Sequence, residues 1–183
     1  MSLRTLRSAR CPRAVLAVAA LAAFASAATQ AAHDGGERLI GQPAPDFALP
    51  AVVGSNVRLS EYRGQAVILS FWSSRCGVCA RELNLLDRLY KTYQSAGLVV
   101  LAISVDDDPD RAAHYAREHV ADYPLLLDSN KAAGRAYDID RLPSTIMIDR
   151  SGIVRFRHSD ELARDKTYLT QIRALLDDSF ATP

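Results

Sequence analysis

The pattern of apolar and polar positions divides the chain into buried strands and amphipathic helices. Two continuous apolar runs, at residues 65–72 and 98–105, are typical of strands that are buried on both faces of a sheet. Between them, residues 76–95 repeat their apolar positions at helical spacing, and the pattern ends before Gly97. This strand–helix–strand unit predicts two parallel strands joined by a right-handed crossover.

Shorter segments on either side of this unit complete the predicted fold. Residues 47–49 and 57–59 should pair as a small hairpin before the first long strand. The later predicted elements are a helix at 110–120, a short strand at 123–128, a short helix at 131–137, a hairpin of strands 144–149 and 153–159, and a closing helix at 162–180. Together they predict an α/β fold in which helices flank a central mixed sheet.

The first residues differ in composition from the rest of the chain. Four arginines and no acidic residue precede residues 14–28, which are apolar and mostly alanine, and Ala25-Ser26-Ala27 offers small residues of the kind that a signal peptidase reads. This apolar stretch is shorter than the roughly 20 residues that a spanning helix needs. We therefore expect residues 1–27 to be a cleaved signal peptide, with a retained membrane anchor as the alternative, and residues 28–40 to be a flexible lead-in.

Composition and charge narrow the possible functions. The chain has 183 residues, 49% apolar and 23% charged, which suits one soluble globular domain after the leader. Removing the four arginines of the leader from the 22 basic residues leaves 18 against 21 acidic ones, without a basic stripe. We therefore expect no binding to nucleic acid. Cys76 and Cys79 become the only cysteines, and an exported protein meets an oxidising compartment in which such a pair can close.

A structural or metal role explains the C-x-x-C pair poorly. A disulfide between Cys76 and Cys79 closes so short a loop that the entropic stabilisation is about 2 kcal/mol, against about 4.7 kcal/mol for a 100-residue loop. Zinc needs about four ligands. His114 and His119 have the spacing of a ligand pair, but 34 residues separate Cys79 from His114, and both histidines lie on a highly charged predicted helix. We predict no metal site.

Redox chemistry fits the position of the pair better. Cys76 follows a buried strand and begins the predicted helix, where unpaired N–H groups and the helix dipole favour thiolate over thiol. Arg75 adds a neighbouring cation, and Cys79, one turn further along the inner side, would be the resolving thiol. Glu82 lies on nearly the same helical face as Cys79 and could exchange protons with it if partly buried. The alternative for Glu82 is an ordinary exposed residue that the helix dipole stabilises.

Four segments of the sequence together carry a family resemblance. "PAPDFALP", "LSEYRGQAVILSFWSSRCGVCARELNLL", "LVVLAISVD" and "LPSTIMIDRSGIV" resemble the TlpA-like, AhpC/TSA-related thioredoxin-like thiol–disulfide oxidoreductases of the bacterial envelope. The resemblance covers about residues 40–180. It implies a thioredoxin-like domain at 41–183, with the N-terminal hairpin and a central insertion within 106–128.

The resemblance also implies roles for individual residues. Cys76 matches the exposed nucleophile, Cys79 the buried resolving cysteine, and Glu82 the glutamate that handles protons. Ser70 stands where thioredoxin has a buried aspartate, which favours Glu82 as the base. Pro143 matches the cis-proline beside the disulfide, and an X-Pro bond reaches the cis form at a cost of only about 0.5–1 kcal/mol.

Two arginines depart from the family pattern. Arg75 replaces the tryptophan that usually precedes the first cysteine, and Arg141 replaces the glycine two residues before the cis-proline. We expect both, together with Trp72, to modulate the disulfide. The arginines would either stabilise the Cys76 thiolate and make the pair more oxidising, or dock an acidic surface of a partner.

The resemblance implies a periplasmic oxidoreductase that reduces disulfides in protein partners. It suggests apocytochrome c, and hence cytochrome c maturation, or copper-site proteins as substrates, with a membrane electron donor, no cofactor and a monomeric state. One alternative is a peroxiredoxin-like thiol peroxidase, which shares the "PAPDF" opening. However, Leu69 and Ser73 occupy the positions of its required proline and threonine. The other is a non-enzymatic copper chaperone, whose relatives space their cysteines more widely and add a nearby histidine.

Overall fold

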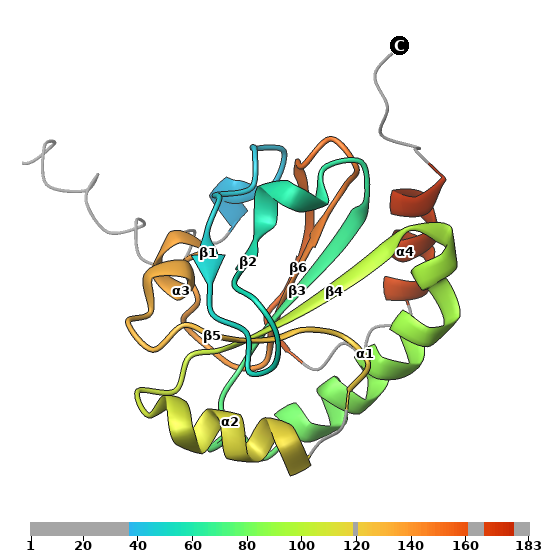
Figure 1. The fold of residues 1–183 in the computed structure, drawn as a ribbon. Coiled ribbons are helices and arrows are strands. Elements are labelled where there is room, and N and C mark those ends of the chain that lie inside the picture. The colour runs from blue at the N-terminus through green and yellow to red at the C-terminus, as the bar shows by residue number, and fades with distance from the viewer. Residues whose placement is uncertain (1–36, 119–120, 161–166, 178–183) are drawn as a thin grey trace, which may run out of the picture. The chain divides into compact units, whose positions relative to one another are not determined.

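The structure is a computed structural model that describes residues 37–118, 121–160 and 167–177 (Figure 1). The chain separates into two units, residues 1–34 and 35–183, and every described residue belongs to the second unit. The predicted signal peptide and most of the predicted lead-in therefore lie outside the described residues and stay predictions. Across the described ranges, no helix is both long enough and apolar enough to cross a membrane.

A five-stranded mixed sheet forms the centre of the domain, with the strand order β5-β4-β3-β6-β7. Its strands are β3 (Ala66–Trp72), β4 (Leu98–Ser104), β5 (Leu125–Leu127), β6 (Ser144–Ile148) and β7 (Val154–His158). Strands β3, β4 and β5 run parallel, whereas β6 is antiparallel to both β3 and β7. Every residue of β3 and β4 is buried, as the two apolar runs predicted.

Helices and a small hairpin cover the two faces of this sheet (Figure 1). On one face, apolar residues of β3 pack with residues of α1 (Cys79–Tyr93), α2 (Pro109–Glu118) and α4 (Tyr168–Leu176). On the other face, the alternate residues of β3 pack with α3 (Ala132–Ala136) and with the hairpin of β1 (Ala48–Leu49) and β2 (Val57–Arg58). The predicted layers and the N-terminal hairpin are therefore confirmed. Short 3-10 turns lie at Glu37–Leu39, Leu59–Tyr62 and Gln94–Ala96.

The element bounds differ from the predictions mainly at helix ends. Helix α1 begins at Cys79 rather than at residue 76. A 3-10 turn follows the helix and ends at Gly97, which has the left-handed conformation with φ of 94°. Glycine adopts this conformation without the steric cost that a side chain brings. Helix α2 and strand β5 occupy the predicted insertion at 106–128. The outer ends of the predicted closing helix lie outside the described residues.

Candidate active site

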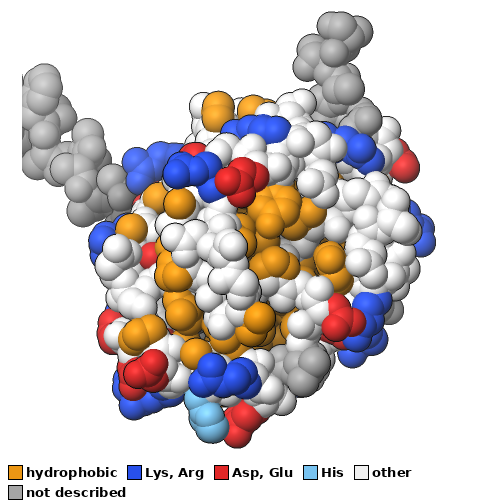
Figure 2. All heavy atoms as spheres, viewed as in Figure 1, with side chains coloured by type: hydrophobic (Ala, Val, Ile, Leu, Met, Phe, Trp, Pro, Cys, Tyr) orange, Lys and Arg blue, Asp and Glu red, His pale blue; other side chains and the backbone are white. Residues whose placement is uncertain are grey.

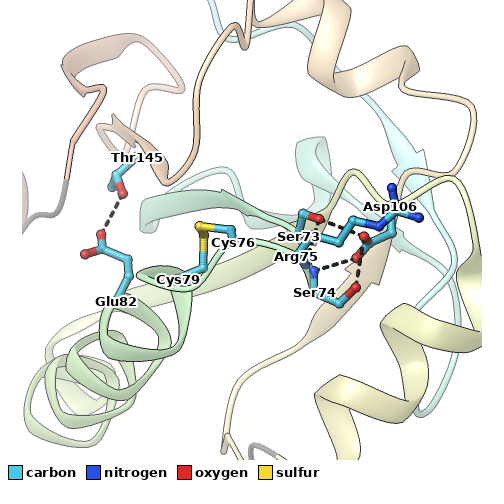
Figure 3. The surroundings of a disulfide bond; sticks show 8 residues. All are labelled: Ser73, Ser74, Arg75, Cys76, Cys79, Glu82, Asp106 and Thr145. Carbon is cyan, nitrogen blue, oxygen red and sulfur yellow. Dashed lines mark hydrogen bonds between the residues drawn. A yellow bond between two sulfur atoms is a disulfide. The ribbon is translucent and has the colours of Figure 1, made fainter.

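The two cysteines form a disulfide at the junction between β3 and α1 (Figure 3). Cys79 is the first residue of α1 and is 0% exposed, whereas Cys76 is half-buried. The Cys79 N–H donates to the Cys76 carbonyl at 3.1 Å, which closes a turn over Gly77 and Val78. The carbonyl of Val78 then accepts from the N–H of Arg81, so Val78 is the N-cap.

The prediction that Cys76 begins the helix is therefore wrong. Cys76, Gly77 and Val78 form a turn before the first residue of the helix. Cys76 therefore lies outside the helix, close to its N-terminus. The unpaired N–H groups and the positive end of the helix dipole still lie at this end of α1. Of the two cysteines Cys76 is the more exposed and Cys79 the buried one.

Glu82 is buried beneath this junction. It lies in the first turn of α1 and is only 1% exposed, so the alternative of an ordinary exposed glutamate is wrong. Its Oε1 accepts a hydrogen bond from the Thr145 hydroxyl at 3.0 Å. Figure 3 shows the Glu82 carboxylate and the disulfide on the same side of α1. Because burial disfavours the charged form of a carboxylate, this group is suited to binding and releasing a proton.

Two hydroxyl residues on neighbouring strands line the same buried region. Thr145 of β6 pairs with Ser70 of β3 in the sheet, and both are 0% exposed. The Ser70 Oγ finds no hydrogen-bond partner among the described residues. The resemblance places Ser70 where thioredoxin has a buried aspartate, and in this structure the buried carboxylate of the region is that of Glu82 on α1. The sequence reasoning missed Thr145, although it directly follows Leu142-Pro143-Ser144.

Pro143 lies at the edge of the sheet from which the active-site loop leaves. The Leu142–Pro143 peptide bond is cis, as the resemblance implied. Ser144 begins β6 and pairs with Phe71, the residue before the last one of β3. Pro143 thus comes just before β6, where β3 ends and the loop toward Cys76 begins. It carries no N–H that could hydrogen-bond to a sulfur.

A buried aspartate that the sequence reasoning missed holds the active-site loop. Asp106 follows β4 and is 7% exposed. It accepts hydrogen bonds from the Ser73 hydroxyl at 2.7 Å, the Ser74 N–H at 2.8 Å, the Ser74 hydroxyl at 3.1 Å and the Ser104 hydroxyl at 2.9 Å. Burial raises the pKa of Asp106, but the hydrogen bonds from Ser74, Ser73 and Ser104 outweigh it, and the net pKa is lowered. The carboxylate therefore stays ionised and fixes the loop.

The available signal for Asp106 was its place in the sheet. Asp106 opens the run Asp106-Asp107-Asp108-Pro109 just before the helix predicted at 110–120, and no local pattern sets its role apart from that of Asp107 and Asp108. Trp72 and Ser104 are the last residues of the parallel strands β3 and β4 and pair with each other. The loops that follow them therefore leave the sheet at the same edge. This places Asp106 beside Ser73 and Ser74.

The three predicted modulating residues differ in their surroundings. Arg75 is exposed, and Figure 3 shows its side chain extending away from the disulfide, past Asp106. Arg141 is also exposed, and its Nε lies 3.8 Å from a carboxylate oxygen of Asp140. Trp72 is fully buried and packs against Tyr115, with ring centroids 5.3 Å apart. Trp72 therefore belongs to the core beneath the site and not to its surface.

Across residues 37–118, 121–160 and 167–177, no group of three or more histidine, cysteine, aspartate or glutamate side chains is placed to hold a metal ion. His114 lies exposed on α2, with its Nε2 3.3 Å from Oε1 of Glu118. His119 lies outside the described residues.

The fold and the disulfide site define a class of protein, the thioredoxin-like thiol–disulfide oxidoreductases, and this chain is one of them. The AhpC/TSA family matches residues 40–157, and the chain belongs to this family. It is 34% identical over 116 residues to the thiol-disulfide oxidoreductase ResA of Geobacillus thermodenitrificans, covering 63% of this chain and 67% of that protein. It is 30% identical over 114 residues to ResA of Bacillus subtilis, covering 62% and 64%.

Solved structures show the same likeness. The chain matches the crystal structure of a protein from Chlorobium tepidum, assigned there as a thiol:disulfide interchange protein DsbE, with a TM-score of 0.71 and 30% identity. The match covers 75% of this chain and 97% of that one. A solution structure from Bacteroides thetaiotaomicron, assigned as a protein disulfide isomerase, matches with a TM-score of 0.69 and 26% identity, covering 77% and 92%. These likenesses extend over most of the domain that contains the site.

Proposed function

We propose that this oxidoreductase is exported to the periplasm, where it reduces disulfides in protein partners through Cys76 and Cys79. The observation that carries the proposal is the asymmetric pair, a half-buried Cys76 bonded to a fully buried Cys79 above the buried carboxylate of Glu82. An accessible sulfur can meet a large partner, and a buried one can only complete the exchange.

The proposed reaction starts from the reduced protein. The Cys76 thiolate attacks one sulfur of the substrate disulfide; this forms a mixed disulfide and releases the other substrate sulfur as a thiolate, which takes up a proton. Glu82 then accepts the proton of Cys79, whose thiolate attacks the Cys76 sulfur. The Cys76–Cys79 bond forms, the mixed disulfide breaks, and the second substrate sulfur leaves and is protonated. The substrate gains two electrons, the protein loses two, and the product is the protein with the Cys76–Cys79 disulfide that the structure contains.

Each turnover needs a donor that returns two electrons to the disulfide. In the periplasm a membrane electron donor would supply them, because that compartment is kept oxidising. Apocytochrome c and copper-site proteins are the substrate classes that we propose, both of which need reduced cysteines. We expect the oxidoreductase to act as a monomer.

The activity is tested by insulin reduction with dithiothreitol as the electron source. We expect the wild-type protein to accelerate precipitation of the insulin B chain and Cys76→Ser to be inactive. Equal rates for the two proteins would contradict the reductase. Equilibration with glutathione then gives the direction, since a midpoint near about −270 mV resembles thioredoxin and one near about −120 mV a strong oxidant.

Export is tested separately with the full-length chain in a Gram-negative host. We expect the protein in the periplasmic fraction, with an N-terminus at Ala28 after cleavage behind Ala27. An unprocessed chain in the cytoplasmic fraction would contradict the proposal. An unprocessed chain in the membrane fraction would support the retained anchor instead.

A further inference from the structure

We propose that a groove beside the disulfide binds an acidic polypeptide segment that flanks the substrate cysteines. The inference rests on the proposed function, because it takes a protein disulfide as the substrate. The groove has a volume of about 580 Å³ and is formed by the loop before Cys76, the loop after β4, the start of α3 and the loop before Pro143. Ligand-binding clefts typically measure about 300–1,000 Å³.

The groove is continuous with the redox pair along the chain on two sides. Arg75 lines it and directly precedes Cys76, and Leu142 lines it and directly precedes Pro143. A polypeptide that brings a disulfide to the half-buried Cys76 therefore has the groove next to its own backbone. In Figure 3 the Arg75 side chain extends away from the sulfurs toward Asp106, which also lines the groove. This direction favours contact with a partner over stabilisation of the Cys76 thiolate.

The aspartates of the groove already have partners. Asp106 accepts its four hydrogen bonds from serines, and Asp107 pairs with Lys131 at 2.5 Å. The hydrogen bond from Lys131 lowers the pKa of Asp107, and the charges of Lys131 and Arg75 add to this. Asp108 lies 3.8 Å from Arg111, and Asp140 lies 3.8 Å from Arg141 and 3.7 Å from the half-buried Arg157. An incoming lysine would compete with these cations.

Two arginines of the groove, Arg75 and Arg135, are exposed, and neither guanidinium forms an ion pair with a residue that the structure describes. The charge of Arg75 acts on Asp107, but without such a contact. Figure 2 shows charged side chains of both signs along the edge where α2 and α3 lie. Arginine presents a planar fork that matches a carboxylate, so these two side chains can each bind one acidic residue.

The expected discrimination is moderate because both arginines are exposed. Exposed ion pairs are weak individually and are screened by salt. For two arginines we expect about a tenfold rate advantage for an acidic over a basic segment at low ionic strength, since rim charges act mainly on association. The advantage should disappear at about 1 M salt.

The experiment compares two disulfide-linked peptides that are identical except for three residues beside one cysteine, which are glutamates in one and lysines in the other. The reduced full-length protein is mixed with each peptide at low ionic strength. The second-order rate constants are measured by acid quenching, alkylation and mass spectrometry. We expect the glutamate peptide to react about tenfold faster. The ratio should fall toward one in the double variant Arg75→Gln/Arg135→Gln. The control variant Arg88→Gln/Arg117→Gln removes the same charge elsewhere and should keep the wild-type ratio.

A wild-type ratio near one at low salt would overturn the inference, and so would a ratio that survives in Arg75→Gln/Arg135→Gln. If glutathione disulfide oxidises the protein faster than both peptides, and the double variant slows that reaction, the groove binds a small thiol compound and not a polypeptide. Failure of the proposed function looks different, because then neither peptide oxidises the reduced protein at a useful rate.

Discussion

Replacing Glu82 by glutamine separates its chemical role from its structural role. Glutamine has nearly the same size, and its carbonyl oxygen can still accept the hydrogen bond that Thr145 donates to Oε1 at 3.0 Å. The substitution also removes an ionisable group from a site that is only 1% exposed. We therefore expect the free energy of unfolding to change by less than about 1 kcal/mol.

The kinetic effect should be much larger than the effect on stability. The amide cannot accept the proton of Cys79, and general base catalysis typically contributes about 10²–10⁴-fold. We take the lower end and expect the intramolecular attack of Cys79 to slow about 100-fold, which is about 2.7 kcal/mol of activation free energy. The attack of Cys76 on the substrate does not use this proton and should change little.

The assay mixes reduced protein with a peptide disulfide, quenches with acid and measures the mixed disulfide by mass spectrometry. The intermediate should accumulate in Glu82→Gln but not in the wild type, and its resolution should accelerate as rising pH supplies hydroxide as the base. Glu61→Gln, at an exposed position, is the matched control. If the intermediate in Glu82→Gln resolves as fast as in the wild type, Glu82 is not the base.

Three further changes test the surroundings of the site. Asp106→Ala should lower the free energy of unfolding by about 2–3 kcal/mol at pH 7. Because the folded pKa of Asp106 is below its ordinary value of 3.8, this stabilisation is present above pH 3.8 and is lost as pH falls through the folded pKa. Urea unfolding should therefore show the variant approaching the wild type in acid; a constant difference would contradict this. Arg157→Ala should lower the free energy of unfolding by about 2 kcal/mol and speed hydrogen exchange in the loop before Pro143, because the Arg157 guanidinium donates to the carbonyls of Tyr137 at 2.7 Å and Asp138 at 2.8 Å. Unchanged exchange would show that this loop does not depend on Arg157. Trp72, the only tryptophan, is buried in the same core cluster as Cys79. We expect its fluorescence emission to rise when the disulfide is reduced, because a disulfide quenches an excited indole that lies close to it. A change that persists in Cys76→Ser would have another origin.

The strands and their pairing could be predicted because strands buried on both faces have continuous runs of apolar residues. β3 and β4 are buried on both faces, so all their residues are apolar or small, and the crossover helix between them makes them parallel. The same helical spacing placed Glu82 on the face of Cys79. Its burial depended on β6, which brings Thr145 against it from 63 residues away.

The start of α1 and the role of Asp106 could not be predicted from local patterns. Val78, the N-cap, provides no side-chain cap, so no Ser, Thr, Asp or Asn marked the boundary. Asp106 acts on Ser73 and Ser74 through contacts that span 33 and 32 positions, respectively. Such contacts follow from the register of β3 with β4, which the sequence does not state. The direction of the Arg75 side chain likewise depends on the loop that Asp106 fixes.

The unequal anchoring of the two cysteines has a consequence for how the protein cycles. Cys79 belongs to helix α1, which packs into the core, whereas Cys76 belongs to a short loop that Asp106 holds at one end through the Ser74 N–H. Breaking and forming the disulfide therefore requires movement only in this loop, and β3 and α1 on either side of it can keep their positions. Such a protein can pass electrons repeatedly without disturbing the packing of its interior.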